Sequence, residues 1–266
     1  MYECKARGKF RKDANVPMVG DYVDIEARGG KGSIEKIHER KSMLIRPAVA
    51  NINQLAVVAA LASPDPNPSL IDSFLIIAKH SGIDAILCLN KSDLTTSDEL
   101  EKIYRASGIK VVITNAISGE GIDELKSLLS GKITAFAGNS GVGKSSLLNA
   151  LGAGALETGE ISEKIRRGRH TTRHVELLEL GDGALVLDTP GFSSFEMPKI
   201  RANELENYFI EFEEYIGKCK FRGCSHTSEP GCAVLEALDE GKISKMRHES
   251  YKNIYEQLKQ IKEWER

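Results

Sequence analysis

The fold of this chain is decided by residues 138–145, which read Gly138-Asn139-Ser140-Gly141-Val142-Gly143-Lys144-Ser145. They fit the pattern G-x-x-x-x-G-K-[ST], follow the apolar residues 133–137 and precede a segment with helical periodicity at 146–151. The glycines let successive backbone N–H groups surround phosphate oxygens, and the start of a helix adds a positive dipole. Lys144 is expected to neutralise the β and γ phosphates and Ser145 to bind Mg²⁺. The pattern predicts a phosphate-binding loop, with a ligand-free glycine-rich turn as the alternative.

A second motif, Asn90-Lys91-Ser92-Asp93, closes the apolar stretch 85–89 and fits the guanine signature NKxD. The Asp93 carboxylate can accept hydrogen bonds from N1–H and from the exocyclic amine of guanine, whereas adenine has an acceptor at N1. Residues Asn115-Ala116-Ile117 follow the next apolar stretch and are expected to present a backbone N–H to the guanine oxygen. The base is therefore predicted to be guanine, and a plain turn at a strand end is the alternative.

Two further segments are typical of a GTP site. Asp188-Thr189-Pro190-Gly191 ends the apolar stretch 184–187 and fits DxxG, in which the carboxylate holds Mg²⁺ and the glycine backbone senses the γ-phosphate. An aspartate before a turn without a nucleotide is the alternative. The sequence Arg-Arg-Gly-Arg-His-Thr-Thr-Arg at 166–173 suits a switch I loop, in which Thr172, preferred over Thr171, completes the Mg²⁺ shell.

These motifs together predict one site for GTP with Mg²⁺. The residues expected to contact GTP are Asn90, Lys91, Asp93, Asn115, Ala116, Ile117, Gly138, Asn139, Ser140, Gly141, Val142, Gly143, Lys144, Ser145, Ser146, Thr172 and Gly191. The expected Mg²⁺ ligands are Ser145, Thr172 and Asp188.

The order of the motifs is unusual. An ordinary GTPase domain has the phosphate loop, switch threonine and DxxG before NKxD, but here NKxD comes first. The original termini of a compact α/β domain lie near each other at its surface, so a circular permutation leaves the site unaltered when each motif keeps its place at the sheet edge. We therefore predict a circularly permuted P-loop GTPase domain of α/β class at 51–200.

Apolar runs separated by stretches of helical period predict parallel strands with crossover helices in this domain. We expect strands at 55–60, 85–89, 111–114, 133–137, 174–179 and 184–187. Capping boxes are expected at Ser69 with Asp72 and at Thr96 with Glu99, and helix ends at Gly82, Gly108 and Gly131.

The first segment, residues 1–50, is basic, with eleven Lys and Arg against seven Asp and Glu. Residues 19–25 and 33–38 alternate with a period of two around a glycine-rich turn at 29–32, which indicates short strands. We predict a β-barrel like the oligonucleotide-binding (OB) fold, which is either abbreviated or lacks a first strand, because a complete one normally needs more than about 47 residues. Its cations, and those of 164–173, suit contacts with an RNA backbone, although charge runs are usually just solvated.

Three cysteines and a histidine lie within fourteen residues near the C-terminus: Cys219, Cys224, His226 and Cys232. Three thiolates and an imidazole are the ligand set of a closed tetrahedral zinc site, so we predict one structural Zn²⁺ in a helical zinc-binding domain at 201–266. Disulfides are disfavoured in a reducing compartment, and four protein ligands leave no open position for catalysis. Residues 244–266 are expected to form one amphipathic helix.

Composition agrees with a globular protein, since 41% of the 266 residues are apolar and 28% are charged, with a net charge of −2. No apolar stretch approaches the roughly 20 residues that cross a bilayer. The N-terminus lacks the apolar region of an export signal, so a cytoplasmic location and no membrane partner are expected. The chain is expected to act as a monomer.

The motif order, the small β-barrel, the stretch Gly168 to Thr172 and the Cys/His site together resemble the RsgA (YjeQ) family of GTPases that depend on the small ribosomal subunit. The resemblance implies a bacterial cytoplasmic factor that binds the 30S subunit and its rRNA, acts late in subunit maturation, and hydrolyses GTP faster when bound there. The chain departs from the family at Ile117, where a lysine is often seen, and in a barrel that lacks the usual leading strand.

The sequence lacks, at its usual position, the residue that orients the attacking water during hydrolysis. Phe192 follows DxxG where a glutamine normally orients the attacking water, so intrinsic turnover should be slow. His170, beside the switch threonine, is the candidate to position that water, and a histidine that contacts RNA or solvent is the alternative. Two rival functions are a guanine-nucleotide switch that binds RNA with little hydrolysis and a P-loop ATPase or kinase, against which Asp93 argues.

Overall fold

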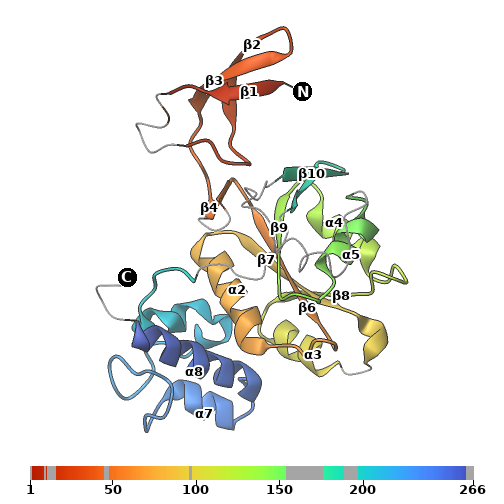
Figure 1. Cartoon of the computed structure of the whole chain (residues 1–266). Coiled ribbons are helices and arrows are strands. Elements are labelled where there is room, and N and C mark those ends of the chain that lie inside the picture. Colours follow the sequence, from red (N-terminus) through yellow and green to blue (C-terminus); the bar gives the residue numbers. More distant parts are fainter. Residues whose placement is uncertain are drawn as a thin grey trace, which may run out of the picture.

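The computed structural model describes residues 2–8, 10, 16–44, 48–95, 98–153, 176–188 and 197–261. Figure 1 shows three parts: small N-terminal strands at the top, a central α/β body, and C-terminal helices beside one edge of that body. Among the described residues, none of the helices combines the length and the hydrophobicity that crossing a membrane requires.

The central body is built on one six-stranded sheet. Its strands lie in the order β10-β11-β9-β6-β7-β8. Their bounds are β6 Gln54–Ala60, β7 Asp84–Asn90, β8 Lys110–Thr114, β9 Ile133–Ala137, β10 Glu176–Gly181 and β11 Ala184–Asp188. All neighbours are parallel except β10 and β11.

Helices cover both faces of this sheet. Their bounds are α2 Pro68–His80, α3 Glu99–Ala106, α4 Ile122–Leu129 and α5 Lys144–Leu151, and a short 3₁₀ turn, η1 Ser92–Leu94, follows β7. Every residue of β6 is buried. Leu55 and Val57 pack with residues of α2 and α3, whereas Ala56 and Val58 pack with residues of α4 and α5. A strand that is buried on both faces explains the continuous apolar run in the sequence.

The predicted strands of this body are present, with ends that differ by at most two residues. The expectation of parallel strands is wrong for β10, which pairs antiparallel with β11. The two residues between them, Asp182 and Gly183, both have positive φ, as a two-residue hairpin turn requires. This Asp-Gly dipeptide was a local signal for a hairpin at the edge of the sheet.

The predicted helix ends are confirmed, but the capping box predicted at Ser69 with Asp72 is wrong. Gly82, Gly108 and Gly131 each follow a helix C-cap with positive φ. Helix α2 begins at Pro68, and its N-cap is Asn67, whose Oδ1 accepts the N–H of Leu70 at 3.1 Å. Asp98 is the N-cap of α3, and Thr96 lies outside the described residues. Asp72 is not a capping residue, because it faces the C-terminal helices.

The N-terminal part consists of short strands in two small sheets. Strands β1 Glu3–Ala6, β2 Val23–Arg28 and β3 Lys31–Ile37 form a sheet in the order β1-β3-β2, and β4 Met43–Leu44 pairs with β5 Val49–Ala50. An isolated bridge joins Val19 to Val49. The turn at Gly29 and Gly30 separates β2 from β3 as the sequence predicts. The strand predicted at 19–25 begins later, at Val23, and β1 was not predicted.

The C-terminal part has its own aromatic core. Its elements are the 3₁₀ segments η3 Ala202–Tyr208 and η4 Ile210–Phe212, and the helices α7 Ala233–Asp239 and α8 Lys245–Gln260. Phe209 and Phe212 pack against Tyr251, with ring centroids 5.2 and 4.8 Å from the tyrosine. The predicted helix 244–266 starts as expected after Ser244 but ends at Gln260, because Ile261 has an extended backbone with ψ 116°.

A buried ion network joins α8 to the central body. The Arg247 side chain is 3% exposed and pairs with Asp72 of α2 and with Glu211, whose Oε1 lies 2.7 Å from Arg247 Nε. Tyr104 of α3 donates a 2.9 Å hydrogen bond to Asp72. The Arg247 guanidinium also lies 4.6 Å from the centroid of the Phe209 ring. Figure 1 shows the blue helix α8 beside α2, so this network lies where the two parts meet.

We predict that Arg247→Met lowers the free energy of unfolding by about 3–5 kcal/mol, because it leaves two carboxylates buried without their cation. Urea unfolding of the full chain measures this. The control is Lys79→Met, which removes the more exposed pair with Glu213 in the same interface and should cost about 1 kcal/mol or less. Equal losses for the two variants would contradict the importance of the buried network.

Candidate functional site

The motifs found in the sequence meet at one edge of the central sheet. Because β7, β8, β9 and β11 run parallel with β6, their carboxyl ends lie at the same edge. Asn90 ends β7, Asn115 follows β8, Gly138 follows β9 and Asp188 ends β11. The structure therefore brings together motifs that stand in permuted order along the chain.

The phosphate loop connects β9 to α5 through glycines with positive φ. Gly141 and Gly143 have φ of 79° and 93°, and a side chain at Gly138 would collide with the carbonyl of Val58. Ser145 and Ser146 lie in the first turn of α5, both partly buried. Only glycine allows the backbone to run this close to β6 and to turn into the helix at this point.

Lys144 occupies the centre of this loop. Its Nζ donates hydrogen bonds of 2.7 Å to the carbonyls of Gly138 and Asn139. Burial lowers the pKa of the Lys144 ammonium to about 8. A phosphate group would restore favourable electrostatics for this ammonium, so the lysine is suited to bind an anion.

The side chain of Asn90 ties the phosphate loop to the guanine motif. Its Nδ2 donates a 2.8 Å hydrogen bond to the carbonyl of Val142, and its Oδ1 accepts one of 3.2 Å from Thr114 Oγ1. All the atoms involved are buried. A side chain at Gly143 would collide with Asn90 Nδ2, so this glycine makes the contact possible. Thr114 was missed in the sequence, although it ends β8 directly opposite Asn90.

Asn115 organises the residues expected to recognise the base. Its Nδ2 donates a 3.0 Å hydrogen bond to Asp93 Oδ1, which fixes the carboxylate that should read guanine. Its own Oδ1 accepts the backbone N–H groups of Ile117 and Ser118 at 2.9 and 3.2 Å. The Ile117 side chain is 91% exposed. The N–H of Ile117 therefore already has a partner within the loop.

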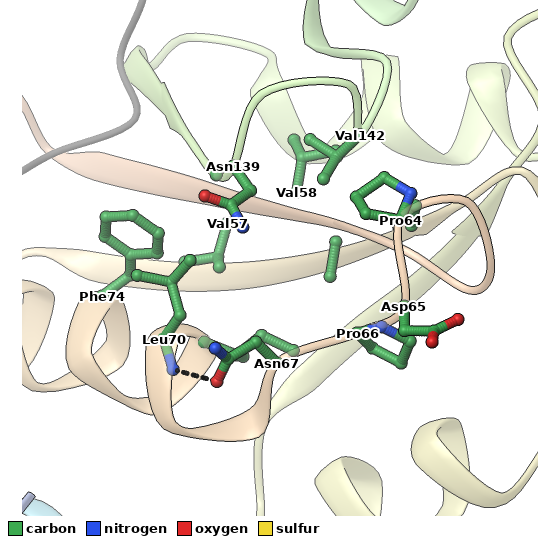
Figure 2. Close-up of a pocket in the computed structure, with 14 residues that line it drawn as sticks. Val57, Val58, Pro64, Asp65, Pro66, Asn67, Leu70, Phe74, Asn139 and Val142 are labelled. Atoms are coloured by element: carbon green, nitrogen blue, oxygen red, sulfur yellow. Dashed lines mark hydrogen bonds between the residues drawn. The ribbon is translucent and has the colours of Figure 1, made fainter.

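A small pocket lies beside the phosphate loop (Figure 2). It is lined by the end of β6, by residues 64–67, by the start of α2, and by Gly138, Asn139 and Val142. Lys91 of the guanine motif has a left-handed backbone, with φ of 64°, and its Nζ donates to the carbonyl of Ser63 in the loop that precedes Pro64. Neither Asn90 nor Asp93 lines this pocket, so it is distinct from the expected base site.

Several predicted residues lie outside the described part of the chain. They are the switch I stretch 166–173 with His170, Thr171 and Thr172, and Thr189, Pro190, Gly191 and Phe192. The backbone of Asp188 is described at the end of β11, next to β9. The roles of Thr172, Asp188 and Gly191 in binding Mg²⁺ and the γ-phosphate remain predictions.

The Cys/His cluster forms a second candidate site. The ligand atoms of Cys219, Cys224, His226 and Cys232 all lie within 4.8 Å of one another. Cys219 Sγ is 3.8 Å from Cys232 Sγ and 3.5 Å from His226 Nδ1. A tetrahedral zinc with bonds of about 2.3 Å to sulfur and 2.0–2.1 Å to nitrogen holds its ligands about 3.5–3.8 Å apart. The geometry therefore fits a metal ion of this size.

The surroundings of the cluster also fit a metal. Glu206 Oε2 lies 2.6 Å from His226 Nε2, which leaves Nδ1 as the ligand atom. Burial raises the pKa of the Cys224 thiol to about 12, so thiolates at this position require a bound cation. Sequence reasoning missed Glu206, which lies twenty residues before His226 and carries no local signal.

Contacts from Glu229 and α8 hold the backbone around the cluster. The Glu229 carboxylate accepts the N–H groups of Ser225, Thr227 and Ser228 at 2.7 to 3.1 Å. Burial opposes its charge, but the bonds from Ser225 Oγ and from the N–H groups of Ser225 and Ser228 lower its pKa to about 2. From α8, His248 Nε2 donates to the carbonyl of His226 at 2.7 Å. Sequence reasoning missed Glu229, although it lies only three residues after a ligand.

Comparisons with known proteins match this chain over almost its whole length. A family model described as RsgA GTPase matches residues 37–198, and one described as RsgA N-terminal domain matches residues 1–34. The chain is 48% identical to "Small ribosomal subunit biogenesis GTPase RsgA" of Agathobacter rectalis, over 97% of this chain and 88% of that relative.

Two solved structures have the same fold. The crystal structure of YjeQ from Thermotoga maritima superimposes with a TM-score of 0.82 at 38% identity, covering 97% of this chain and 90% of that one. YloQ, described as a circularly permuted GTPase, gives a TM-score of 0.77 at 36% identity, covering 97% and 86%. The predicted permuted GTPase fold is therefore confirmed.

We predict that Gly143→Ala abolishes nucleotide binding, because the added methyl group displaces the Asn90 side chain from the phosphate loop. Titration with a fluorescent GDP derivative measures this. The matched control is Gly152→Ala, since Gly152 has a similar φ of 99° but open space around it. Normal binding by Gly143→Ala, or equal loss in both variants, would contradict the role given to the Asn90 contact.

We predict that Glu206→Gln weakens metal binding about 10- to 100-fold, because the histidine ligand loses its carboxylate partner. Competition with a chromogenic chelator measures the affinity for zinc. Glu214→Gln, which changes an exposed glutamate of the same part, is the control and should have no effect. Unchanged affinity in Glu206→Gln would show that the carboxylate does not support the metal.

Proposed function

Because this chain belongs to the RsgA family of GTPases, we propose that it assists biogenesis of the small ribosomal subunit by binding and hydrolysing GTP. The observation that carries the proposal is the hydrogen bond from Asn90 to Val142, which joins a guanine motif to a phosphate loop at one sheet edge. The motif that recognises guanine and the loop that binds the phosphates are therefore in direct contact, as the binding of one guanosine triphosphate requires.

Different residues of the site are proposed to bind the base and the phosphates. We propose that Asp93, held by Asn115, accepts the two guanine N–H groups, and that the phosphate loop surrounds the β and γ phosphates with backbone N–H groups. Lys144 balances the phosphate charge. An Asp93 carboxylate facing adenine N1 would meet an acceptor, which supports GTP over ATP as the substrate.

Hydrolysis also depends on residues beyond the described part of the chain. We propose Ser145, Thr172 and Asp188 as the ligands of Mg²⁺, which supplies positive charge to the phosphates when bound. Phe192 in place of a water-orienting glutamine supports slow intrinsic turnover. We propose that His170 takes over this orientation when the subunit is bound.

The remaining parts are proposed to serve binding to the subunit. We propose a structural Zn²⁺ held by Cys219, Cys224, His226 and Cys232, since four protein ligands leave no open position for a reacting group. We propose a division into a barrel-like unit at 1–50, the GTPase domain at 51–200 and the zinc unit at 201–266. The expected partner is the 30S subunit with its rRNA, in the cytoplasm, and the expected state is a monomer.

The test is phosphate release from GTP and from ATP by the purified chain, with and without 30S subunits, at low and high salt. We expect slow release from GTP alone, strong stimulation by 30S subunits that weakens at high salt, and no stimulated release from ATP. Slow GTP hydrolysis that ignores the subunit would contradict the proposal, and tight RNA and GTP binding without turnover would favour a nucleotide switch.

The same assay tests His170. His170→Ala should reduce the stimulated rate roughly 100-fold, within the usual range for a residue that positions a proton transfer, while GTP binding stays normal. A stimulated rate equal to that of the unchanged protein would remove His170 from the mechanism.

A further inference from the structure

An exposed aromatic side chain lies between two ligands of the proposed metal site. Residues 217–223 read Gly-Lys-Cys-Lys-Phe-Arg-Gly, and Phe221 within them is 49% exposed. We call residues 217–223 the knuckle loop. Phe221 lies two residues after Cys219 and three before Cys224, so the ligands would fix its position closely.

The knuckle loop has a defined backbone. Gly217 and Gly223, at its two ends, have φ of 80° and 70°, where other residues would be strained. The N–H of Lys220 donates a 2.9 Å hydrogen bond to the carbonyl of Gly231, on the segment that leads to the last metal ligand. A loop ordered in advance loses little conformational entropy when a partner binds.

The charged residues of the knuckle loop are all positive. Lys218, Lys220 and Arg222 are exposed, and residues 217–223 contain no carboxylate. Lys220 Nζ lies 5.5 Å from the centroid of the Phe221 ring. Within the described residues, Lys218 and Arg222 make no ion pair, although their unit is rich in glutamate. These cations therefore remain available to an anionic partner.

Among the described residues, the other exposed aromatic side chains lack this setting. Tyr2 and Tyr22 are 55% and 60% exposed, but Tyr2 is next to Glu3, and Tyr22 lies between Asp21 and Asp24. Within the part of the chain that the structure describes, the combination of an aromatic face with unpaired cations therefore distinguishes Phe221. Such a combination matches the two parts of single-stranded nucleic acid, namely bases with flat π faces and a phosphate backbone.

We propose that Phe221 stacks on an unpaired RNA base, and that Lys218, Lys220 and Arg222 contact the flanking phosphates. This rests on the proposed function, because the small subunit would supply the RNA. It adds to that function a defined surface on the zinc unit and a mode of recognition, stacking on a base that is free of a duplex. Paired bases are inaccessible to such a ring, so the knuckle loop should discriminate against double-stranded RNA.

The first test is photocrosslinking of the full, zinc-loaded chain. The probe is a twelve-residue uridine oligonucleotide with one 5-iodouridine at its centre, and the adduct is mapped by mass spectrometry. We expect the adduct on Phe221. Adducts confined to Tyr2 or Tyr22, or no adduct at all, would overturn the proposal.

The second test is the affinity for the same oligonucleotide, measured by fluorescence anisotropy. Phe221→Ala should weaken binding roughly tenfold, as expected for loss of one stacked base. Phe221→Trp should keep the affinity, and Phe221→Leu, which preserves an apolar side chain without a π face, should behave like the alanine variant. Lys218→Ala and Arg222→Ala should each reduce the salt slope by about one. Equal binding by Phe221→Ala and the unchanged chain would overturn the proposal.

Measurements with 30S subunits separate this inference from the proposed function. Zinc content must stay unchanged in every variant, which is expected because Phe221 lies outside the core. If Phe221→Ala loses affinity for 30S subunits but binds the oligonucleotide normally, the knuckle loop contacts a protein and the RNA assignment is wrong. If the unchanged chain shows no response to 30S subunits, the proposed function fails, while the crosslink still decides whether Phe221 stacks on RNA.

Discussion

The buried side chain of Asn90 is the contact on which the nucleotide site depends. Its amide bonds to Val142 of the phosphate loop, 52 residues along the chain, and to Thr114 at the end of β8, 24 residues along. A buried amide left without these partners would cost about 1–3 kcal/mol, so the loops are held together before any nucleotide arrives. Because this contact depends on the sheet edge and not on chain order, the permuted sequence can build the same site.

The helix α2 connects this site to the C-terminal part. The loop before α2 lies beside the phosphate loop, where Pro64 approaches Gly141, and accepts a hydrogen bond from Lys91 at Ser63. One turn into the helix, Asp72 pairs with Arg247 of α8, and the next residue of α8, His248, holds the backbone of His226. The loop before α2 thus lies at the nucleotide site, α8 contacts the metal site through His248, and the pair of Asp72 with Arg247 joins the two helices.

Local patterns in the sequence predicted the strands, the motifs and the helix ends, because each depends on a few adjacent residues. The capping box at Ser69 failed since Asn67 and Pro68 offer a better helix start, which frees Asp72 for a partner 175 residues away. Glu206, Thr114 and Arg247 likewise act through contacts made only in the folded chain. The aromatic and charged character of residues 217–223 was visible in the sequence, but the exposure of Phe221 was not.

The central claim is that one guanine site is assembled from motifs in permuted order, and Asp93 tests it most directly. Equilibrium binding of GTP and of ATP should be measured for the unchanged chain and for Asp93→Asn. We predict that the unchanged chain strongly prefers GTP, and that the variant loses roughly 100-fold of this preference while still binding the triphosphate. Equal binding of GTP and ATP by the unchanged chain, or an undiminished preference in the variant, would contradict this account.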